Sequence, residues 1–209
     1  MKALLSTTYF GPVQWYQKLY RHEEVQIEQW ESFLKQTYRN RCLIATTQGI
    51  QALTVPVERD TSQQIRDIRI SDHGNWRHLH WNALMSAYGE SPFFEYYQDD
   101  IRLFFEDRWA YLFDFNEAIR EKMCELLDIQ PKVTFSSTYH HPADISLTSH
   151  LLPLTSDYRE AINPKHPQPD PDFEPKSYYQ VYQQKHGFLP NLSILDLLFN
   201  MGPESIFYL

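Results

Sequence analysis

The chain has 209 residues, of which 42% are hydrophobic and 22% charged, a balance typical of a soluble globular protein. Its net charge of −8 argues against nucleic acid and anionic membrane surfaces as partners, because both are bound through basic patches. No apolar run is long enough for a signal peptide or a membrane span, so a cytoplasmic location without membrane insertion is predicted.

The first thirty residues predict a strand, a helix and a second strand. Ala3-Leu4-Leu5 is a short apolar run, and a helix is expected to open near Pro12 and to end around Arg21-His22. Residues 23–28 then alternate between polar and apolar side chains. Strand, helix and strand in such close succession predict a parallel pair joined by a crossover.

Two runs rich in β-forming residues follow, at 41–45 and 50–57. They flank Thr46-Thr47-Gln48-Gly49, which predicts a hairpin. Three isoleucines then close this strand-rich first third, at positions 65, 68 and 70.

The middle third changes to a helical pattern. Residues 75–88 carry apolar side chains at helical spacing and are followed by Gly89, a plausible stop. Ser91-Pro92 predicts an N-cap with proline at the first helical position, opening a helix that runs to about Phe105. The longest predicted helix covers 110–127, and a strand is expected at Val133 to Phe135.

The last third holds a proline-rich loop and a short helix. Five prolines lie between Pro164 and Pro175, which predicts a rigid loop on the surface of the domain. Residues 192–201 predict a helix that is apolar around most of its circumference. The predicted fold is therefore a single α/β domain over 1–209, with a mixed sheet from the N-terminal third plus Val133 to Phe135 and the middle helices packed on it.

Several sequence blocks, in order along nearly the whole chain, match a known pattern. They are Tyr9 and Lys18, Asn40-Arg41, Gly49 with Leu53-Thr54-Val55-Pro56-Val57, Trp76 and His80, Tyr88 with Ser91-Pro92, and the run from Leu192 to Gly202. Through these blocks the chain resembles the WbqC-like family of bacterial proteins. One block departs from the family pattern. Many members open with His-Gln-Pro-x-Tyr, where this chain has Leu5-Ser6-Thr7-Thr8-Tyr9.

The resemblance implies a role in surface-polysaccharide (O-antigen-type) biosynthesis. The function it favours is a transferase that moves an acyl or aminoacyl group onto a nucleotide-linked sugar. Two alternatives stay open: a non-catalytic binding or scaffold protein of glycan assembly, and a small amide or ester hydrolase. Because this chain lacks the opening histidine, the resemblance leaves open whether it is an enzyme.

If the chain is a transferase, the polar residues of the matched blocks are the candidate site. Arg41, beside Asn40, would hold an anion, His80 would transfer protons, and Asp196 would orient one of them. The other predicted substrate-binding residues are Tyr9, Tyr179, Gln180 and Asn200. Two of these residues have structural alternatives: His80 as a satisfied core histidine, and Arg41 as one half of a structural or solvated ion pair. The neighbouring Arg39 is expected to be solvated.

The stripe formed by Ser193, Asp196 and Asn200 is by default the solvent face of its helix. The same narrow stripe would also fit a carboxylate buried against Arg41 or His80.

The sequence nominates no cofactor and no metal site. It has no Gly-rich phosphate loop, nucleophile elbow or metal-binding helix motif, and six glycines exclude a dinucleotide fingerprint. The spacings of His78 and His80 and of His140-His141 do not suggest shared ligation of a metal. The expected partner is a small molecule, either a sugar nucleotide or an amino or acyl donor. Cys42 and Cys124 are predicted to be reduced and buried.

Overall fold

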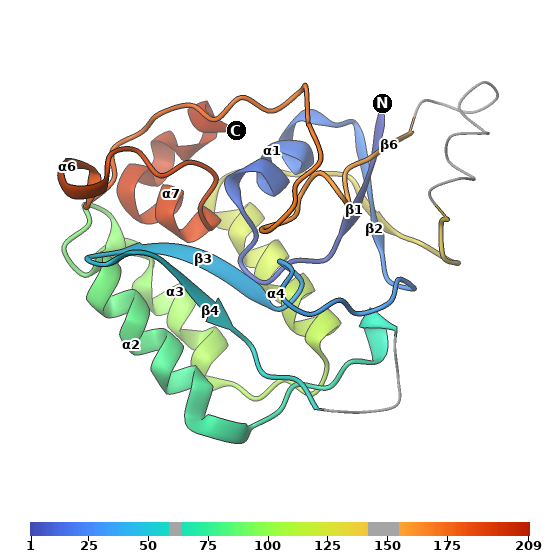
Figure 1. Ribbon diagram of the computed structural model, residues 1–209, viewed down its shortest axis with the longest axis horizontal. Helices are drawn as coiled ribbons and strands as arrows, with labels where there is room; N and C mark the ends of the chain where they lie inside the picture. The colour runs from blue at the N-terminus through green and yellow to red at the C-terminus, as the bar shows by residue number, and fades with distance from the viewer. Residues whose placement is uncertain (59–63, 142–154) are drawn as a thin grey trace.

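The computed structural model describes residues 1–58, 64–141 and 155–209 (Figure 1). β1 (Lys2–Ser6) and β2 (Glu24–Glu28) are connected by α1 (Val13–Arg21), and the two strands pair in parallel from Lys2↔Glu24 to Ser6↔Glu28. The predicted strand, helix and strand are confirmed, and so is their parallel pairing. α1 runs antiparallel to the strands as a crossover must, so both strands end at the same edge of the sheet.

The sheet has four strands in the order β5-β2-β1-β6, and every pair is parallel. β5 (Val133–Phe135) is the strand predicted beyond the longest helix. β6 (Thr155–Asp157) was not predicted, because a three-residue polar strand has neither alternation nor an apolar run to mark it.

β3 (Arg41–Thr46) and β4 (Gly49–Thr54) form the predicted hairpin, with Gly49 supplying the positive φ of its turn. The predicted α/β fold is confirmed, but the hairpin does not join the four-stranded sheet, so the strands form a parallel sheet and a separate antiparallel pair where one mixed sheet was expected. The free edge of β3 is closed by other groups. Leu43 O accepts from Ser193 N at 2.8 Å, and Ala45 N donates to Tyr88 Oη at 3.1 Å.

Three helices from the middle third lie where they were predicted: α2 (Trp76–Tyr88), α3 (Phe94–Glu106) and α4 (Leu112–Leu126). The predicted cap of α3 is wrong. The helix begins at Phe94, and the Ser91 hydroxyl donates to Tyr88 O instead of capping it. The stretch predicted to close the strand-rich third holds the 3₁₀ turn η1 (Ile65–Asp67).

The C-terminal part contains α6 (Gln183–His186), α7 (Ile194–Met201) and the 3₁₀ segment η3 (Gly202–Tyr208), and a further short turn, η2 (His73–Asn75), precedes α2. None of the helices in the described ranges is both long and apolar enough to cross a membrane.

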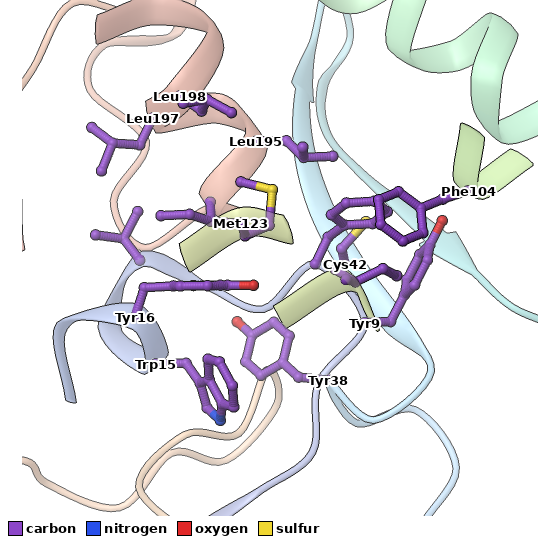
Figure 2. Packing of buried hydrophobic residues seen from close by; sticks show 14 of the residues in the cluster. Tyr9, Trp15, Tyr16, Tyr38, Cys42, Phe104, Met123, Leu195, Leu197 and Leu198 are labelled. Atoms are coloured by element: carbon purple, nitrogen blue, oxygen red, sulfur yellow. The ribbon is translucent and has the colours of Figure 1, made fainter. Parts of the chain in front are cut away.

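Aromatic and aliphatic side chains together build the core between α1, α4, α7 and the hairpin (Figure 2). Trp15 and Tyr16 of α1 and Tyr9 after β1 are almost completely buried. Cys42 and Cys124 are free thiols buried in the same cluster, as predicted. Burial raises the pKa of Cys124 to about 11, which keeps it an unreactive thiol at neutral pH.

The proline-rich segment forms neither helix nor strand and lies against α1. Asp170 anchors it, because its carboxylate accepts from Gln14 Nε2 and pairs with Lys18 Nζ, both at 2.8 Å and both buried. A further hydrogen bond runs from Tyr158 Oη to Asp172 Oδ2 at 3.2 Å. The segment is thus held to the domain surface by a buried ion pair and its hydrogen bonds, as expected of a surface loop.

Candidate functional site

Polar side chains gather at the carboxyl ends of the parallel strands. β1 ends in Ser6, β2 ends in Glu28, Ser136 follows β5, and β6 ends in Asp157. The chain adds β2 and β5 on one side of β1 and β6 on the other, so the direction of connection reverses between β1 and β6. Ligands of open α/β sheets bind outside the carboxyl ends of the strands, at such a reversal.

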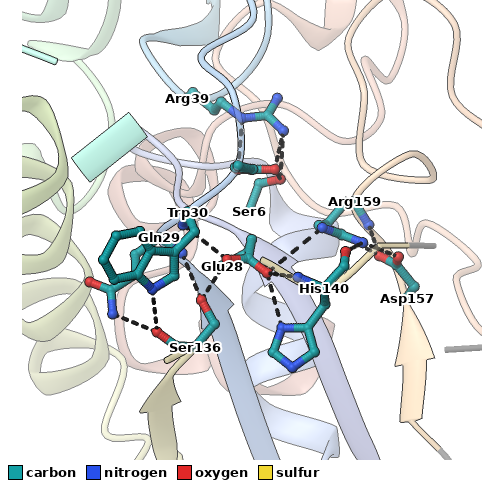
Figure 3. Close-up of polar contacts among 10 residues, drawn as sticks. Ser6, Glu28, Gln29, Trp30, Arg39, Ser136, His140, Asp157 and Arg159 are labelled. Carbon is teal, nitrogen blue, oxygen red and sulfur yellow. Dashed lines mark hydrogen bonds and ion pairs between the residues drawn. The ribbon is translucent and has the colours of Figure 1, made fainter. Parts of the chain in front are cut away.

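Glu28 is the buried carboxylate at the centre of this edge (Figure 3). Its Oε1 accepts from Ser136 Oγ at 2.5 Å and from Trp30 N at 2.9 Å, while Oε2 accepts from His140 N at 2.9 Å. Burial alone would raise the pKa of Glu28, but these hydrogen bonds outweigh it and lower the pKa overall. Glu28 is therefore ionised although water does not reach it.

The imidazole of His140 is oriented by that carboxylate. Its Nδ1 lies 3.0 Å from Glu28 Oε2, and the side chain is 35% exposed. An ionised carboxylate only accepts hydrogen bonds, so Nδ1 carries a proton, and in the neutral tautomer with that proton Nε2 holds the lone pair. A buried carboxylate that fixes the tautomer of a solvent-accessible histidine is the arrangement of a general base.

Two arginines flank the Glu28–His140 pair, and each forms an ion pair with a carboxylate of its own. Arg159 Nε and Nη2 contact the two oxygens of Asp157 at 2.9 and 2.7 Å, and Nη2 also donates to His140 O at 2.9 Å. Arg39 binds Glu31 in the same bidentate way, and its Nη2 donates to Ser6 Oγ at 2.9 Å. Both guanidiniums are buried, so these pairs form a rigid frame around the site.

A small cleft of about 120 Å³ opens beside this frame. Its charged lining consists of Arg39 and Arg159 with three carboxylates, from Glu31, Asp157 and Glu160, and Tyr139 adds an aromatic wall. The formal balance of two positive and three negative groups leaves the cleft with one net negative charge. A cavity of about 10 Å³, which is room for about one water molecule, shares Arg39 and Arg159 with the cleft. The buried Thr8 hydroxyl lines that cavity and has no hydrogen-bond partner among the described residues.

The predicted acid–base residue His80 lies elsewhere, inside the aromatic core. Its Nδ1 is 2.9 Å from the hydroxyl of Tyr9, another predicted site residue, and the two rings pack together with Trp76. Both side chains are buried. Burial lowers the pKa of His80 to about 4, so its ring is neutral at physiological pH.

Asp196 is completely buried, so the default expectation that its stripe faces solvent is wrong. Its Oδ1 accepts from Tyr88 Oη at 2.9 Å, and Oδ2 accepts from Tyr178 Oη and Gln180 Nε2, both at 2.8 Å. Burial raises the pKa of Asp196 to about 6, although the three hydrogen bonds oppose that rise. Neither Arg41 nor His80 is among its partners.

The structure does not bring the other predicted residues to one place. Arg41 is half-buried at the start of β3, where its Nε donates to Thr54 Oγ1, and Asn40 Nδ2 donates to Val55 O. The Asp196 network reaches β3 through Tyr88 at Ala45, four residues and therefore about 13 Å along the strand from Arg41.

The last two predicted residues differ in their surroundings. Tyr179 is 53% exposed, whereas Asn200 is buried and donates to Asp196 O within its own helix.

The displaced pKa values of Asp196 and His80 predict opposite dependences of stability on pH. The folded-state pKa of Asp196 lies above its unfolded value, so its contribution is complete below pH 4 and is lost as the pH rises through 6. The folded-state pKa of His80 lies below its unfolded value, so its contribution is present above pH 6.5 and is lost as the pH falls through 4. Each group changes the free energy of unfolding by about 3 kcal/mol across its pH range, and the two opposite changes largely cancel between pH 4 and 6.

Single substitutions should separate the pH-dependent contributions of Asp196 and His80 to stability. Between pH 6.5 and 4.5, Asp196→Asn should lose unfolding free energy more steeply than the native chain, and His80→Gln less steeply. Urea unfolding at both pH values measures the difference. If both variants run parallel to the native chain, neither group titrates with the displaced pKa described here.

The sequence did not point to the residues that assemble around Glu28. Arg39 was expected to be solvated and is buried. His140 was considered only as a metal ligand, and Glu28, Asp157 and Arg159 were not singled out. One signal was available: Ser6, Glu28 and Ser136 each end or follow a predicted strand, and parallel strands place such positions at one edge. Within the described ranges, no three His, Cys, Asp or Glu side chains are grouped so that they could hold a metal ion.

The chain matches one family of proteins and one protein of known sequence. Residues 7–208 match the model of the WbqC-like protein family. The chain is also similar to Uncharacterized protein Rv1507c of Mycobacterium tuberculosis, with 31% identity over 195 residues that cover 85% of this chain and 83% of the relative. No solved structure matches the chain significantly.

Proposed function

Since the chain belongs to the WbqC-like protein family, we propose that it is a group transferase of surface-glycan biosynthesis whose catalytic base is His140. The observation that carries this proposal is the buried, ionised Glu28 that fixes the tautomer of a solvent-accessible imidazole. In this role the pair replaces His80 and Asp196, which lie buried in two separate networks.

The proposed reaction is the transfer of an acyl or aminoacyl group. Nε2 of His140 removes a proton from a hydroxyl or amine of the acceptor, whose oxygen or nitrogen then bonds to the acyl carbon of the donor. The bond from that carbon to the leaving group breaks, and the leaving group takes the proton from His140. Glu28 stabilises the imidazolium while it carries the proton.

The volume and the charge of the cleft support a reaction in which the transferred group is small. A volume of about 120 Å³ is well below the roughly 300 Å³ or more of pockets that enclose a whole drug-sized ligand, so only part of a donor fits inside. The net negative charge of the cleft favours a group that carries an ammonium, which an aminoacyl group has and a simple acyl group lacks. The acceptor would be a nucleotide-linked sugar bound outside the cleft.

A direct assay tests the proposal. Purified protein is incubated with acetyl and alanyl thioesters of coenzyme A as donors and uridine-diphosphate-linked amino sugars as acceptors, and products are detected by mass spectrometry. Transfer that depends on His140 is the expected result. Hydrolysis of the thioester without transfer would favour the hydrolase alternative. If His140→Ala neither loses a product nor changes the binding of any of these compounds, the proposed site is wrong.

A further inference from the structure

A pocket of about 360 Å³ lies between the start of α2 and the end of α3, and it shares no lining residue with the cleft described above. Its charged lining consists of Arg77, Arg102 and Arg108 with two carboxylates, from Asp72 and Glu106. The formal balance leaves one net positive charge in the pocket, on a chain whose net charge is −8. The pocket therefore attracts anions although the chain as a whole repels them.

The three guanidiniums of this pocket make few bonds within the chain. Arg77 Nη1 and Arg108 Nη1 share the carboxylate of Asp72, at 2.6 and 3.3 Å. Arg102 Nε donates to Glu106 Oε1 at 2.6 Å. A guanidinium has five N–H donors, and within the described residues each of these three makes only that one hydrogen bond. Most of the donors that line the pocket therefore have no acceptor in the chain, unlike the arginines of the frame around Glu28, which are held in bidentate pairs.

Arg77 is the most enclosed of the three arginines, with its side chain 14% exposed. Its Nε and Nη2 are buried and have no hydrogen-bond partner in the described part of the chain. The guanidinium lies over the ring of Trp76, 4.7 Å from the ring centre, which supports its plane at the pocket. Buried donors without acceptors are destabilising, and an oxyanion in the pocket would supply the acceptors after a small turn of this side chain.

The first turn of α2 adds to the positive potential of the pocket. Asn75, Arg77 and His78 line the pocket where this helix begins. The turn contains no acidic side chain, and the N-cap residue Asn75 makes no capping hydrogen bond through its side chain. The positive end of the helix dipole is therefore not compensated by a carboxylate of its own helix.

Aromatic side chains give the pocket a second kind of contact. Trp81 and Phe105 both line it, with their ring centres 5.9 Å apart. Phe94 stacks on Trp81 at 6.0 Å, so the indole is held in place although it is only partly buried. A planar heterocycle can stack on such a ring.

We propose that this pocket binds a mononucleotide, whose phosphates contact the arginines and whose base stacks on Trp81. Guanidinium groups match phosphate oxygens through paired N–H donors. A volume of about 360 Å³ lies near the lower end of the range for small-molecule pockets, which suits one nucleotide better than a dinucleotide. Stacking tolerates different bases, so adenine and uracil nucleotides should bind with similar affinity.

Calorimetric titration of the full chain with ADP, inorganic pyrophosphate and adenosine tests the proposal. ADP is the probe of choice because a uridine nucleotide would also bind on the acceptor side of the proposed transfer. One ADP per chain is expected, with a Kd at least about tenfold lower than that of pyrophosphate or adenosine, since each of these lacks one half of the contacts. No binding of ADP at about 1 mM, or an affinity for ADP that either fragment matches, would overturn the proposal.

Variants then locate the bound nucleotide. Arg102→Gln removes an exposed guanidinium and should raise the Kd of ADP about tenfold, the usual worth of a hydrogen bond to a charged group. Arg66→Gln is the matched control outside the pocket, where Arg66 lies over Trp30, and should leave the Kd within about twofold because distant exposed charges are screened.

Trp81→Leu separates the two halves of the proposed ligand. It should weaken ADP about tenfold and leave the Kd of pyrophosphate unchanged, and the retained pyrophosphate binding also shows that the variant is folded. If Arg102→Gln binds ADP as tightly as the native chain, or if a folded Trp81→Leu does so, the nucleotide lies elsewhere and the proposal is wrong.

Discussion

Replacing His140 by alanine is expected to lower the rate of the proposed transfer by about 10² to 10⁴-fold, the usual contribution of a general base. The change removes the imidazole whose Nδ1 contacts Glu28 but leaves the main-chain N–H of residue 140, which donates to the same oxygen. Glu28 also retains Ser136 and Trp30 as donors. The unfolding free energy should therefore fall by only about 1 kcal/mol, the net worth of one hydrogen bond.

Initial rates and melting temperatures of the same preparations separate catalysis from folding. His141→Ala is the matched control, because it removes a histidine from the adjacent position without touching the contact to Glu28. Its rate should stay within about threefold of the native rate, well below the loss expected for a general base. A His140→Ala rate within twofold of the native rate would show that this histidine is not the base.

Replacing Asp196 by alanine is expected to cost roughly 3–5 kcal/mol of unfolding free energy. The substitution strands three buried donors, the hydroxyls of Tyr88 and Tyr178 and the amide of Gln180, and each unsatisfied group costs about 1–3 kcal/mol. Loss of the desolvated carboxylate offsets part of this sum. For a chain of this length the melting temperature should fall by about 10 °C.

Tyr179→Ala provides the control for Asp196→Ala in a neighbouring segment. Tyr179 lies between two partners of Asp196 but is itself half-exposed, so its loss should cost within about 0.5 kcal/mol. Chemical unfolding of both variants measures the contrast. A cost below about 1 kcal/mol for Asp196→Ala would mean that the network around it does not hold the C-terminal segment to the hairpin.

Much of the local structure could be predicted from the sequence. The first strand, α1 and β2, the hairpin, and the helices of the middle third follow from apolar spacing and turn residues, which act over a few neighbouring positions. Family membership and the burial of both cysteines were likewise available from the sequence. Local signals failed where an element was short and polar, as in β6, or where a serine bonded backward instead of capping, as at Ser91.

The composition of the candidate site was decided by the tertiary structure alone. The sequence suggested that a histidine and a carboxylate act together, but Glu28 and His140 are 112 positions apart and meet only because β2 and β5 pair in parallel. Asp196 was visible as a polar exception in an apolar helix. Its partner Tyr88 is 108 positions away and reaches it because α7 and α2 pack on the same hairpin. Side-chain partners across such separations depend on how distant segments approach, which no periodicity along the chain records.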